Sequence, residues 1–201
     1  MRYLNVLMVV WLILFLPGCG KKKSTKPPTE NGGSLADYLP LQVGNWWKYE
    51  RVFWEESGYT FVDTFTETVV EQDTVLGGKL AFRLEEDEGV DEEWMVVFND
   101  ELRLYEEMPE QYSDYYVFLK LPIQVGNKWN YYPGYPLQAE IVSTTATLNV
   151  PAGTFNNCIH VRVPPYFNAW FVEKKGGIQW SNCDLDSTYG EDDKLIEYHV
   201  E

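Results

Sequence analysis

The chain has 201 residues, with 31 Asp and Glu against 16 Lys and Arg, which gives a formal net charge of −15 at pH 7. This length allows one or two domains, and this acidity excludes nucleic-acid binding through phosphate neutralisation. Because 45% of the residues are hydrophobic, the chain can bury a core and is not a disordered tail.

Residues 1–18 have the pattern of an export signal. Arg2 precedes an uninterrupted apolar run over residues 6–16, which fits a signal peptide and is too short to span ~30 Å of hydrocarbon as a helix. The run ends in Leu16-Pro17-Gly18-Cys19, which resembles the lipobox of bacterial lipoproteins. That resemblance implies cleavage before Cys19 and acylation of both its sulfur and its amine, which is enough for stable anchoring. An ordinary signal peptide with an incidental cysteine is the alternative.

Residues 19–34 are rich in Lys, Pro and Gly and lack apolar periodicity, so they are predicted to form a flexible tether after the lipidated cysteine. The four lysines of this tether either attract anionic lipid or keep the linker solvated. Residues 35–201 carry 11 basic and 30 acidic residues, and this net charge of −19 predicts a body held off the bilayer. Gly20, rather than Asp, follows Cys19, which by the same resemblance favours the outer over the inner membrane.

Residues 35–201 are predicted to form a single all-β domain. Val, Thr and aromatic residues dominate between Gly, Pro, Asn and Asp, and no helical stripe is present. Residues 159–163 alternate strictly between apolar and polar, as in a half-buried strand. The spacing of these turn-forming residues predicts ten to twelve antiparallel strands in a barrel, a curved open sheet or a sandwich.

The segment 60–75 departs from this simple alternation. One face carries Phe65, Glu67 and Val69 together with further acids, and the other face is rich in Thr, so neither face is wholly apolar. We therefore expect this strand either to line a roomy barrel or to project past the edge of a sandwich.

Three segments are predicted to be turns between strands. Residues 150–153 read Val-Pro-Ala-Gly, which is typical of a type I turn. Residues 98–101 and 174–177 are expected to connect hairpins.

A decapeptide occurs twice. Residues 40–49 recur as residues 122–131, with eight of ten positions identical or conservatively changed. This predicts two duplicated units, 35–117 and 118–201. The first unit holds 21 acids and 5 bases and the second 9 acids and 6 bases, so we expect the first to stay solvated and the second to carry contacts.

The Pro-Leu-x-Val-Gly-Asn-x-Trp-x-Tyr opening at 40–49 and the Pro-Ala-Gly-Thr-Phe-Asn-Asn-Cys segment at 151–158 resemble a family of exported bacterial proteins. Many members of this family are lipidated, most have unknown function, and some carry a TapB-like label. The resemblance covers most of 38–201 and implies an all-β extracytoplasmic body. It supplies no catalytic residues.

Cys158 and Cys183 remain once Cys19 carries lipid. An exported protein folds in an oxidising compartment, so a disulfide between them is expected. A metal site with His160 is the alternative, but two Cys and one His leave zinc short of a fourth ligand.

Signals for catalysis are sparse, and we expect no enzyme activity and no cofactor. No nucleophile elbow, P-loop or HExxH motif is present, and His160 lies on the polar face of its strand. Residues 85–93 are strongly acidic, which is typical of a solvated turn, and a Ca²⁺ site formed by these carboxylates is the alternative. Asp184 and Asp186 begin like a calcium loop, but Tyr189 stands where such a loop needs Gly, so they are only weak metal candidates.

Aromatic side chains are abundant, with 8 Trp, 14 Tyr and 10 Phe. The tryptophans recur at matching positions of the two units, which indicates core residues. Two groups of tyrosines are candidates for binding, because these rings suit both interfaces and sugar stacking. These residues are Tyr112, Tyr115, Tyr116, Tyr131, Tyr132 and Tyr135.

These patterns favour a non-enzymatic, membrane-anchored binding or scaffolding module of the bacterial envelope. Its expected partners are the membrane through its anchor and an envelope protein, glycan or lipid, but not nucleic acid. A carrier with a β-barrel cavity for a lipid or other apolar ligand is the alternative, and an envelope hydrolase is a third. An apolar cavity of several hundred Å³ would favour the carrier, a packed interior the module, and convergent carboxylates the enzyme.

Overall fold

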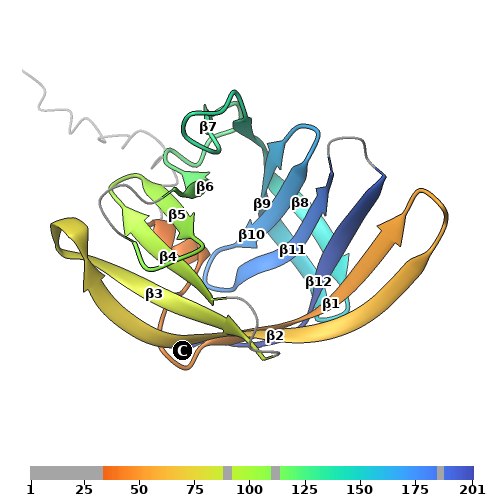
Figure 1. Cartoon of the computed structure of the whole chain (residues 1–201), viewed down its shortest axis with the longest axis horizontal. Helices are drawn as coiled ribbons and strands as arrows, with labels where there is room; N and C mark the ends of the chain where they lie inside the picture. Colours follow the sequence, from red (N-terminus) through yellow and green to blue (C-terminus); the bar gives the residue numbers. More distant parts are fainter. Residues whose placement is uncertain (1–33, 88–91, 110–113, 185–187) are drawn as a thin grey trace, which may run out of the picture. The chain divides into compact units, whose positions relative to one another are not determined.

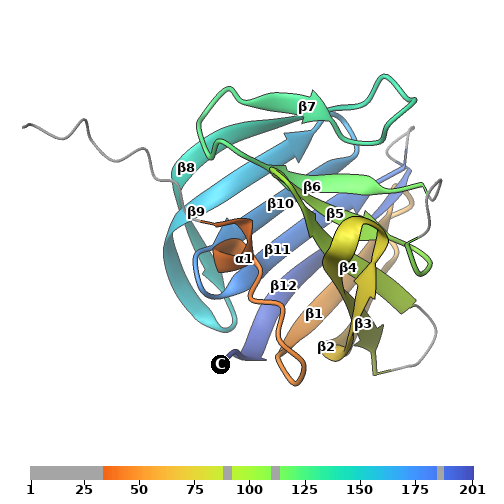
Figure 2. The same ribbon diagram turned by 90° about the vertical axis from the view of Figure 1, so that its left-hand side faces the viewer.

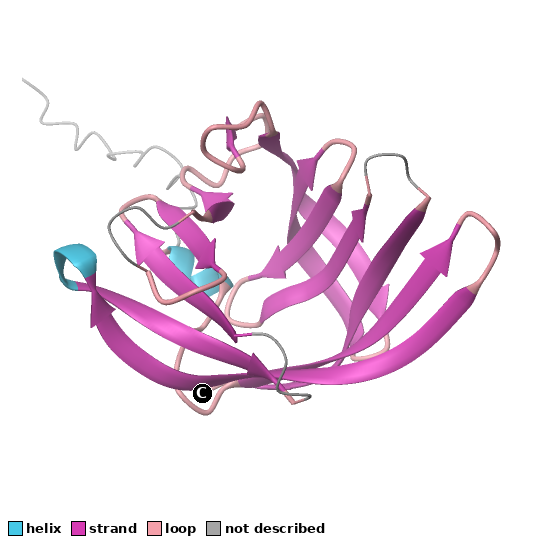
Figure 3. Cartoon of the chain, viewed as in Figure 1, coloured by secondary structure: helices cyan, strands magenta, loops and turns pink. Residues whose placement is uncertain are grey.

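The computed structural model describes residues 34–87, 92–109, 114–184 and 188–201. They form a short helix, α1 (Leu35–Tyr38), a 3-10 turn at Leu76–Gly78 and twelve strands (Figure 3). The strands are β1 (Trp46–Glu55), β2 (Thr60–Val75), β3 (Lys79–Glu86), β4 (Glu92–Phe98), β5 (Glu101–Tyr105), β6 (Tyr116–Lys120), β7 (Lys128–Asn130), β8 (Gln138–Val150), β9 (Gly153–Val163), β10 (Phe167–Val172), β11 (Gly176–Cys183) and β12 (Tyr189–His199).

All twelve strands belong to one antiparallel sheet, in the order β6-β5-β4-β3-β2-β1-β12-β11-β10-β9-β8-β7. The sheet curls until its edge strands β6 and β7 approach each other (Figure 1). There the Trp129 indole N–H donates to the Val117 carbonyl at 2.7 Å, and the Val117 N–H donates to the Tyr131 carbonyl at 2.8 Å. The prediction of an all-β fold is confirmed as a nearly closed barrel.

Alternation along each strand places apolar side chains inside. In β9, Ile159, Val161 and Val163 are buried, and Arg162 between them is exposed. In β10, Phe167, Ala169 and Phe171 are buried in the same way. A side-chain period of two therefore explains the interior of these strands.

The N-terminal segment of the described body packs against one end of the barrel, next to β11 (Figure 2). The Ser34 side chain accepts from the backbone, and Asp37 accepts from the Ser34 N–H, forming a capping box that starts α1. Leu35, Tyr38 and Leu39 are buried in the main core. Within the part of the chain that the structure describes, no helix has the length and apolar character needed to cross a bilayer.

The repeated decapeptide adopts the same backbone arrangement twice. The Gly44 N–H donates to the Val69 carbonyl and the Val69 N–H to Asn45, at 2.8 and 2.9 Å. In the second copy the Gly126 N–H donates to the Ile141 carbonyl and the Ile141 N–H to Asn127, at 2.8 and 3.0 Å. Each copy contains a buried tryptophan whose indole N–H donates to a backbone carbonyl, Trp47 to Lys175 at 2.6 Å and Trp129 to Val117.

The predicted hairpin turns are present. Val150 pairs with Gly153 across the β8–β9 turn. The β4–β5 and β10–β11 turns each contain a residue with positive φ, Asn99 at 58° and Lys174 at 62°.

The expected disulfide is wrong. No disulfide links Cys158 to Cys183; the Cys158 thiol donates to the Phe155 carbonyl and the Cys183 thiol to the Pro165 carbonyl, each at 3.4 Å. Cys158 lies on β9 and Cys183 on β11, which flank β10 on opposite sides. Two strand spacings amount to about 9–10 Å, and a disulfide spans Cα atoms at most about 7 Å apart.

Candidate functional site

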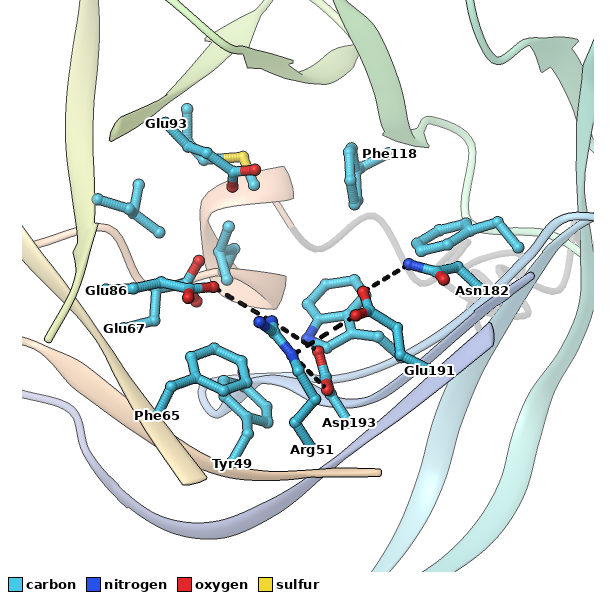
Figure 4. A pocket seen from close by; sticks show the side chains of 15 residues that line it. Tyr49, Arg51, Phe65, Glu67, Glu86, Glu93, Phe118, Asn182, Glu191 and Asp193 are labelled. Atoms are coloured by element: carbon cyan, nitrogen blue, oxygen red, sulfur yellow. Dashed lines mark hydrogen bonds and ion pairs between the residues drawn. The ribbon is translucent and has the colours of Figure 1, made fainter. Parts of the chain in front are cut away.

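A cavity of about 150 Å³ lies inside the barrel (Figure 4). Its walls combine apolar and aromatic side chains with carboxylates, and we call it the acidic pocket. The carboxylates are Glu67, Glu86, Glu93, Glu191 and Asp193. Arg51 is the single basic side chain among the residues that line it, so the pocket holds four negative charges in excess when every group is ionised.

Arg51 occupies the centre of one side of the pocket. It lies on β1 directly across from Asp193 on β12, and its guanidinium binds that carboxylate through two hydrogen bonds of 3.0 and 3.1 Å. The guanidinium also bonds Glu86 at 3.2 Å and lies 3.7 Å from Glu191. Its carbon atom Cζ stands 3.8 Å from the centre of the Phe65 ring. The site therefore already holds one cation between carboxylates and an aromatic face.

Asp193 is buried, with 4% of its surface exposed. Burial is the main cause that raises the pKa of its carboxyl to about 6; Arg51 opposes this rise, and repulsion from Glu191 and Glu86 contributes to it. Glu191 in turn accepts a hydrogen bond of 2.7 Å from the Asn182 amide. The pKa of Asp193 is thus raised although Arg51 favours the carboxylate, because the cost of burying the charge is larger than the stabilisation that Arg51 supplies.

Glu67 lies on β2 between the buried residues Phe65 and Val69, so it faces the interior. Burial raises the pKa of Glu67 to about 8, and Glu93, Glu86 and Asp193 add repulsion that Arg51 only partly offsets. Among the described residues nothing hydrogen-bonds or ion-pairs with the Glu67 carboxyl, and no buried side-chain oxygen is left without a partner. Its oxygens therefore remain accessible from the pocket.

The rest of the wall is aromatic. Tyr49 is buried at its base, and its hydroxyl donates to the Gly177 carbonyl at 3.1 Å. Phe118, Phe167 and Trp180 form one packed group, with ring centres 5.4–6.1 Å apart. These rings give the pocket a largely aromatic wall beside its carboxylates.

The carboxylates do not converge on a point. Across residues 34–87, 92–109, 114–184 and 188–201, no group of three or more His, Cys, Asp or Glu side chains is placed to ligate a metal ion. Of the weak calcium candidates, Asp184 accepts from the backbone N–H of Thr188 at 2.6 Å and of Tyr189 at 3.2 Å, which closes its own loop. Asp186 lies outside the described residues.

Four of the candidate tyrosines come together where β6 meets β7, and none of them is among the residues that line the acidic pocket. Tyr116 stacks with Tyr132 and packs at a tilt against Tyr131, with ring centres 5.0 and 5.4 Å apart, and Tyr132 contacts Tyr135 at 4.8 Å. Tyr115 packs against Tyr105 instead. Tyr112 lies outside the described residues, as does Cys19.

Part of this tyrosine cluster is structural. Tyr131 stacks on the buried Phe167 with ring centres 5.6 Å apart. Tyr116 and Tyr132 border a second hollow of about 260 Å³ with Glu106, Glu107 and Asp114.

His160 is less exposed than its polar strand face suggests. Its ring stacks on Trp170 with centres 4.3 Å apart and bonds the Asn168 amide at 3.0 Å. Burial lowers the pKa of His160, with the Arg162 charge adding to the effect. It forms an outer-face contact on β9 and does not line the acidic pocket.

The acidic pocket was not among the sites predicted from the sequence. The mixed face that holds Glu67 was expected, but neither Glu67 nor Arg51 nor Asp193 was predicted as a site residue. The available signal was a charged residue in phase with buried ones: Arg51 two positions after Tyr49, and Asp193 two positions before Leu195.

Comparison with known proteins places the chain in no family: no family model and no curated protein matches it. Among solved structures, it is similar to a protein from Parabacteroides distasonis described as a "putative lipoprotein" (TM-score 0.47, 15% identity, covering 81% of this chain and 98% of that one). It is also similar to a "putative exported protein with YmcC-like fold" from Bacteroides fragilis (TM-score 0.44, 13% identity, covering 81% and 98%). Likeness at this level transfers no property to this chain.

Proposed function

We propose that this protein is a lipid-anchored, non-enzymatic binding module of the bacterial envelope, and that its binding site is the acidic pocket. The observation that carries the binding role is a cavity inside the barrel with five carboxylates and one guanidinium among its lining residues. Charged groups in a barrel interior lose hydration, and an apolar core would be more stable. Binding a ligand of compensating charge would explain why the barrel keeps these charged residues in its interior.

The anchor is supported by the sequence around Cys19 and by the lysine-rich tether that follows it. The strongly acidic body is repelled by anionic lipid while the tether is attracted to it, which holds the barrel clear of the surface. The outer membrane is the proposed location. The Cys19→Ser variant tests this: the protein should move from the membrane fraction to the soluble fraction and lose incorporation of labelled palmitate. Unchanged membrane retention would contradict anchoring through Cys19.

The character of the acidic pocket favours a small polar ligand over an apolar one. A volume of about 150 Å³ is below the several hundred Å³ of most cavities that enclose drug-sized ligands. Burying an acyl chain against ionised carboxylates would leave those charges without partners. A charged pocket of this size therefore suits one small headgroup or side chain better than a lipid.

A binding test compares chemical classes directly. The purified full-length chain in detergent is heated with a panel of small amines, amino acids, monosaccharides and a 16-carbon fatty acid, and the melting temperature is followed. At least one polar class should stabilise the protein without being converted to product. Stabilisation by the fatty acid alone would favour the carrier, and turnover of a probe would favour the hydrolase. Failure of the whole panel would contradict a binding role.

A further inference from the structure

Three acids of the acidic pocket lie on neighbouring strands of the first half of the barrel. Glu67 on β2 is directly opposite Glu86 on β3, and Leu84 on β3 is directly opposite Glu93 on β4. Like charges at directly opposite positions of a sheet destabilise it.

The equivalent interior positions in the second half of the barrel can be found by aligning the two halves. Because the two decapeptide turns bond Val69 and Ile141 in the same way, β2 and β8 can be aligned on these residues. Glu67, two residues before Val69, then corresponds to Ala139, two residues before Ile141. Ala139 is fully buried.

The alignment extends across the sheet through the strand pairing. Val69 pairs with Leu84 and Ile141 with Val161. Glu86, two residues after Leu84, therefore corresponds to Val163, two residues after Val161.

The residue that corresponds to Glu93 is found from the pairing of β3 with β4 and of β9 with β10. Leu84 pairs with Glu93 and Val161 pairs with Ala169, so Glu93 corresponds to Ala169. Val163 and Ala169 are also fully buried. The same framework thus accepts Ala, Val and Ala where the first half places three carboxylates.

We propose, resting on the binding role above, that the acidic pocket takes one organic cation, a primary ammonium or guanidinium group, against the carboxylates of Glu67, Glu86 and Glu93. Of these three acids, Glu86 is bound by Arg51 at 3.2 Å, whereas Glu67 faces the cavity with its oxygens accessible. A second cation beside Glu67 supplies the charge that Arg51 does not. The spread of the carboxylates, which suits no single metal ion, suits a cation several atoms wide.

Arg51 itself shows that the pocket accommodates this chemistry. Its guanidinium lies over the Phe65 ring while it bonds Asp193 and Glu86. The remaining aromatic wall, which includes Trp180, offers a second cation the same combination of ring faces and carboxylates. A neutral or anionic ligand of equal size would leave the excess negative charge uncompensated.

Binding exchanges a proton for the cation. With a pKa of about 8, the Glu67 carboxyl is mostly protonated at pH 7. When the cation binds, the O–H bond of Glu67 breaks, the carboxylate pairs with the cation and the proton passes to the buffer. The charged groups that set the pKa of Glu67 are Glu93 on β4, Glu86 on β3, Asp193 on β12 and Arg51 on β1. Tyr49 on β1 and Glu191 on β12 are the other titratable side chains that line the pocket.

Calorimetry on the full-length chain in detergent tests the exchange with butylguanidinium, which stays charged at every pH used. Titrations at pH 7 and pH 9, each in two buffers of different ionisation enthalpy, give the affinity and the number of protons released. For a Glu67 pKa of about 8, we expect about 0.9 proton released at pH 7, about 0.1 at pH 9, and an affinity about tenfold higher at pH 9. Butanol and butyrate, of similar shape, should bind much more weakly.

The Glu67→Gln variant should bind butylguanidinium at least tenfold more weakly at pH 9, release no proton and lose the dependence on pH. Asp63→Asn, which removes a charge from an exposed position of the same strand, should behave as the wild type. Glu67→Gln removes an unfavourable buried charge, so it should fold at least as well as the wild type, and its melting curve checks this.

The outcomes separate this inference from the proposed function. Binding without proton release and unchanged in Glu67→Gln would overturn the role of Glu67, and preferential binding of butanol or butyrate would overturn the cation class; both would leave the pocket a binding site. No binding by butylguanidinium or by butylammonium would overturn the inference, and the wider panel would then decide the binding role separately.

Discussion

The first six strands and the last six share one framework but enclose different interiors. In both, a Gly-Asn turn bonds the second strand of its half in the same way, and a tryptophan indole closes onto a backbone carbonyl. Yet Glu67, Glu86 and Glu93 stand in one half where Ala139, Val163 and Ala169 stand in the other.

This difference shows that the backbone hydrogen bonds that form the barrel do not determine which side chains fill its interior. Hydrogen bonds of the turns and ladders are made by the backbone, so they survive replacement of an interior Ala by Glu. The side chains inside then determine whether that half of the interior is a dry core or a polar site. The excess acidity of the first half is thus partly internal, contrary to the expectation that it lies on a solvated surface.

The largest expected effect comes from removing the one cation of the acidic pocket. Arg51→Met leaves Asp193 buried without its partner, which should lower the free energy of unfolding by about 3–5 kcal/mol at pH 8. Urea denaturation measures the loss. The loss of unfolding free energy should be smaller at pH 5, where more of the carboxyls are protonated. Arg162→Met, on the outer face of β9, should cost less than about 0.5 kcal/mol, and an equal loss in both variants would contradict a central role for Arg51.

Because the two halves share one framework, substitution of either buried tryptophan should cause a similar loss of stability. Trp47→Phe and Trp129→Phe each remove an indole N–H that bonds a backbone carbonyl and leave space in the core. Each should lower the free energy of unfolding by about 2–3 kcal/mol. Trp170→Phe, at a part-buried outer position, is the control and should cost less. A large loss at only one of the two buried positions would show that the halves are not equivalent in energy.

Much of the framework was predictable because its signals are local. Alternation in residues 159–163 and the turn residues at 98–101 and 150–153 depend on near neighbours, and the structure confirms each of them. The decapeptide likewise carries its own hydrogen bonds, through an asparagine that bonds the proline carbonyl five residues earlier in both copies.

The site was not predictable because it depends on pairing between distant segments. Arg51 and Asp193 are 142 residues apart, and only the β1–β12 pairing makes them direct neighbours. The disulfide prediction failed for the same reason: an even number of cysteines does not reveal that β10 separates them. A charge in phase with buried residues is a local signal, but its partner is not.

Glu67 distinguishes the halves through the dependence of stability on pH. Its pKa is about 8 in the folded chain against an ordinary value of 4.5, so the folded state binds the extra proton between these values. Ionisation of Glu67 therefore weakens the fold as pH rises from about 4.5 to 8, and the full cost is present above pH 8. Because one pKa unit corresponds to about 1.4 kcal/mol, Glu67→Gln should add up to about 5 kcal/mol to the free energy of unfolding at pH 9 and little at pH 4. The same measurement on Asp63→Asn should show no such pH dependence.

The smallest effect tests the turns themselves. Gly44 and Gly126 have φ values of 98° and 87°, and no atom lies within 4 Å of a Cβ added to either. Alanine at each position therefore pays only for the backbone conformation, about 1 kcal/mol. Because the two turns share their hydrogen bonds, Gly44→Ala and Gly126→Ala should shift the urea midpoint equally, whichever interior the turn faces. Unequal shifts would mean that the charged interior of the first half strains its turn. The stability of the backbone framework would then depend on the side chains that it encloses.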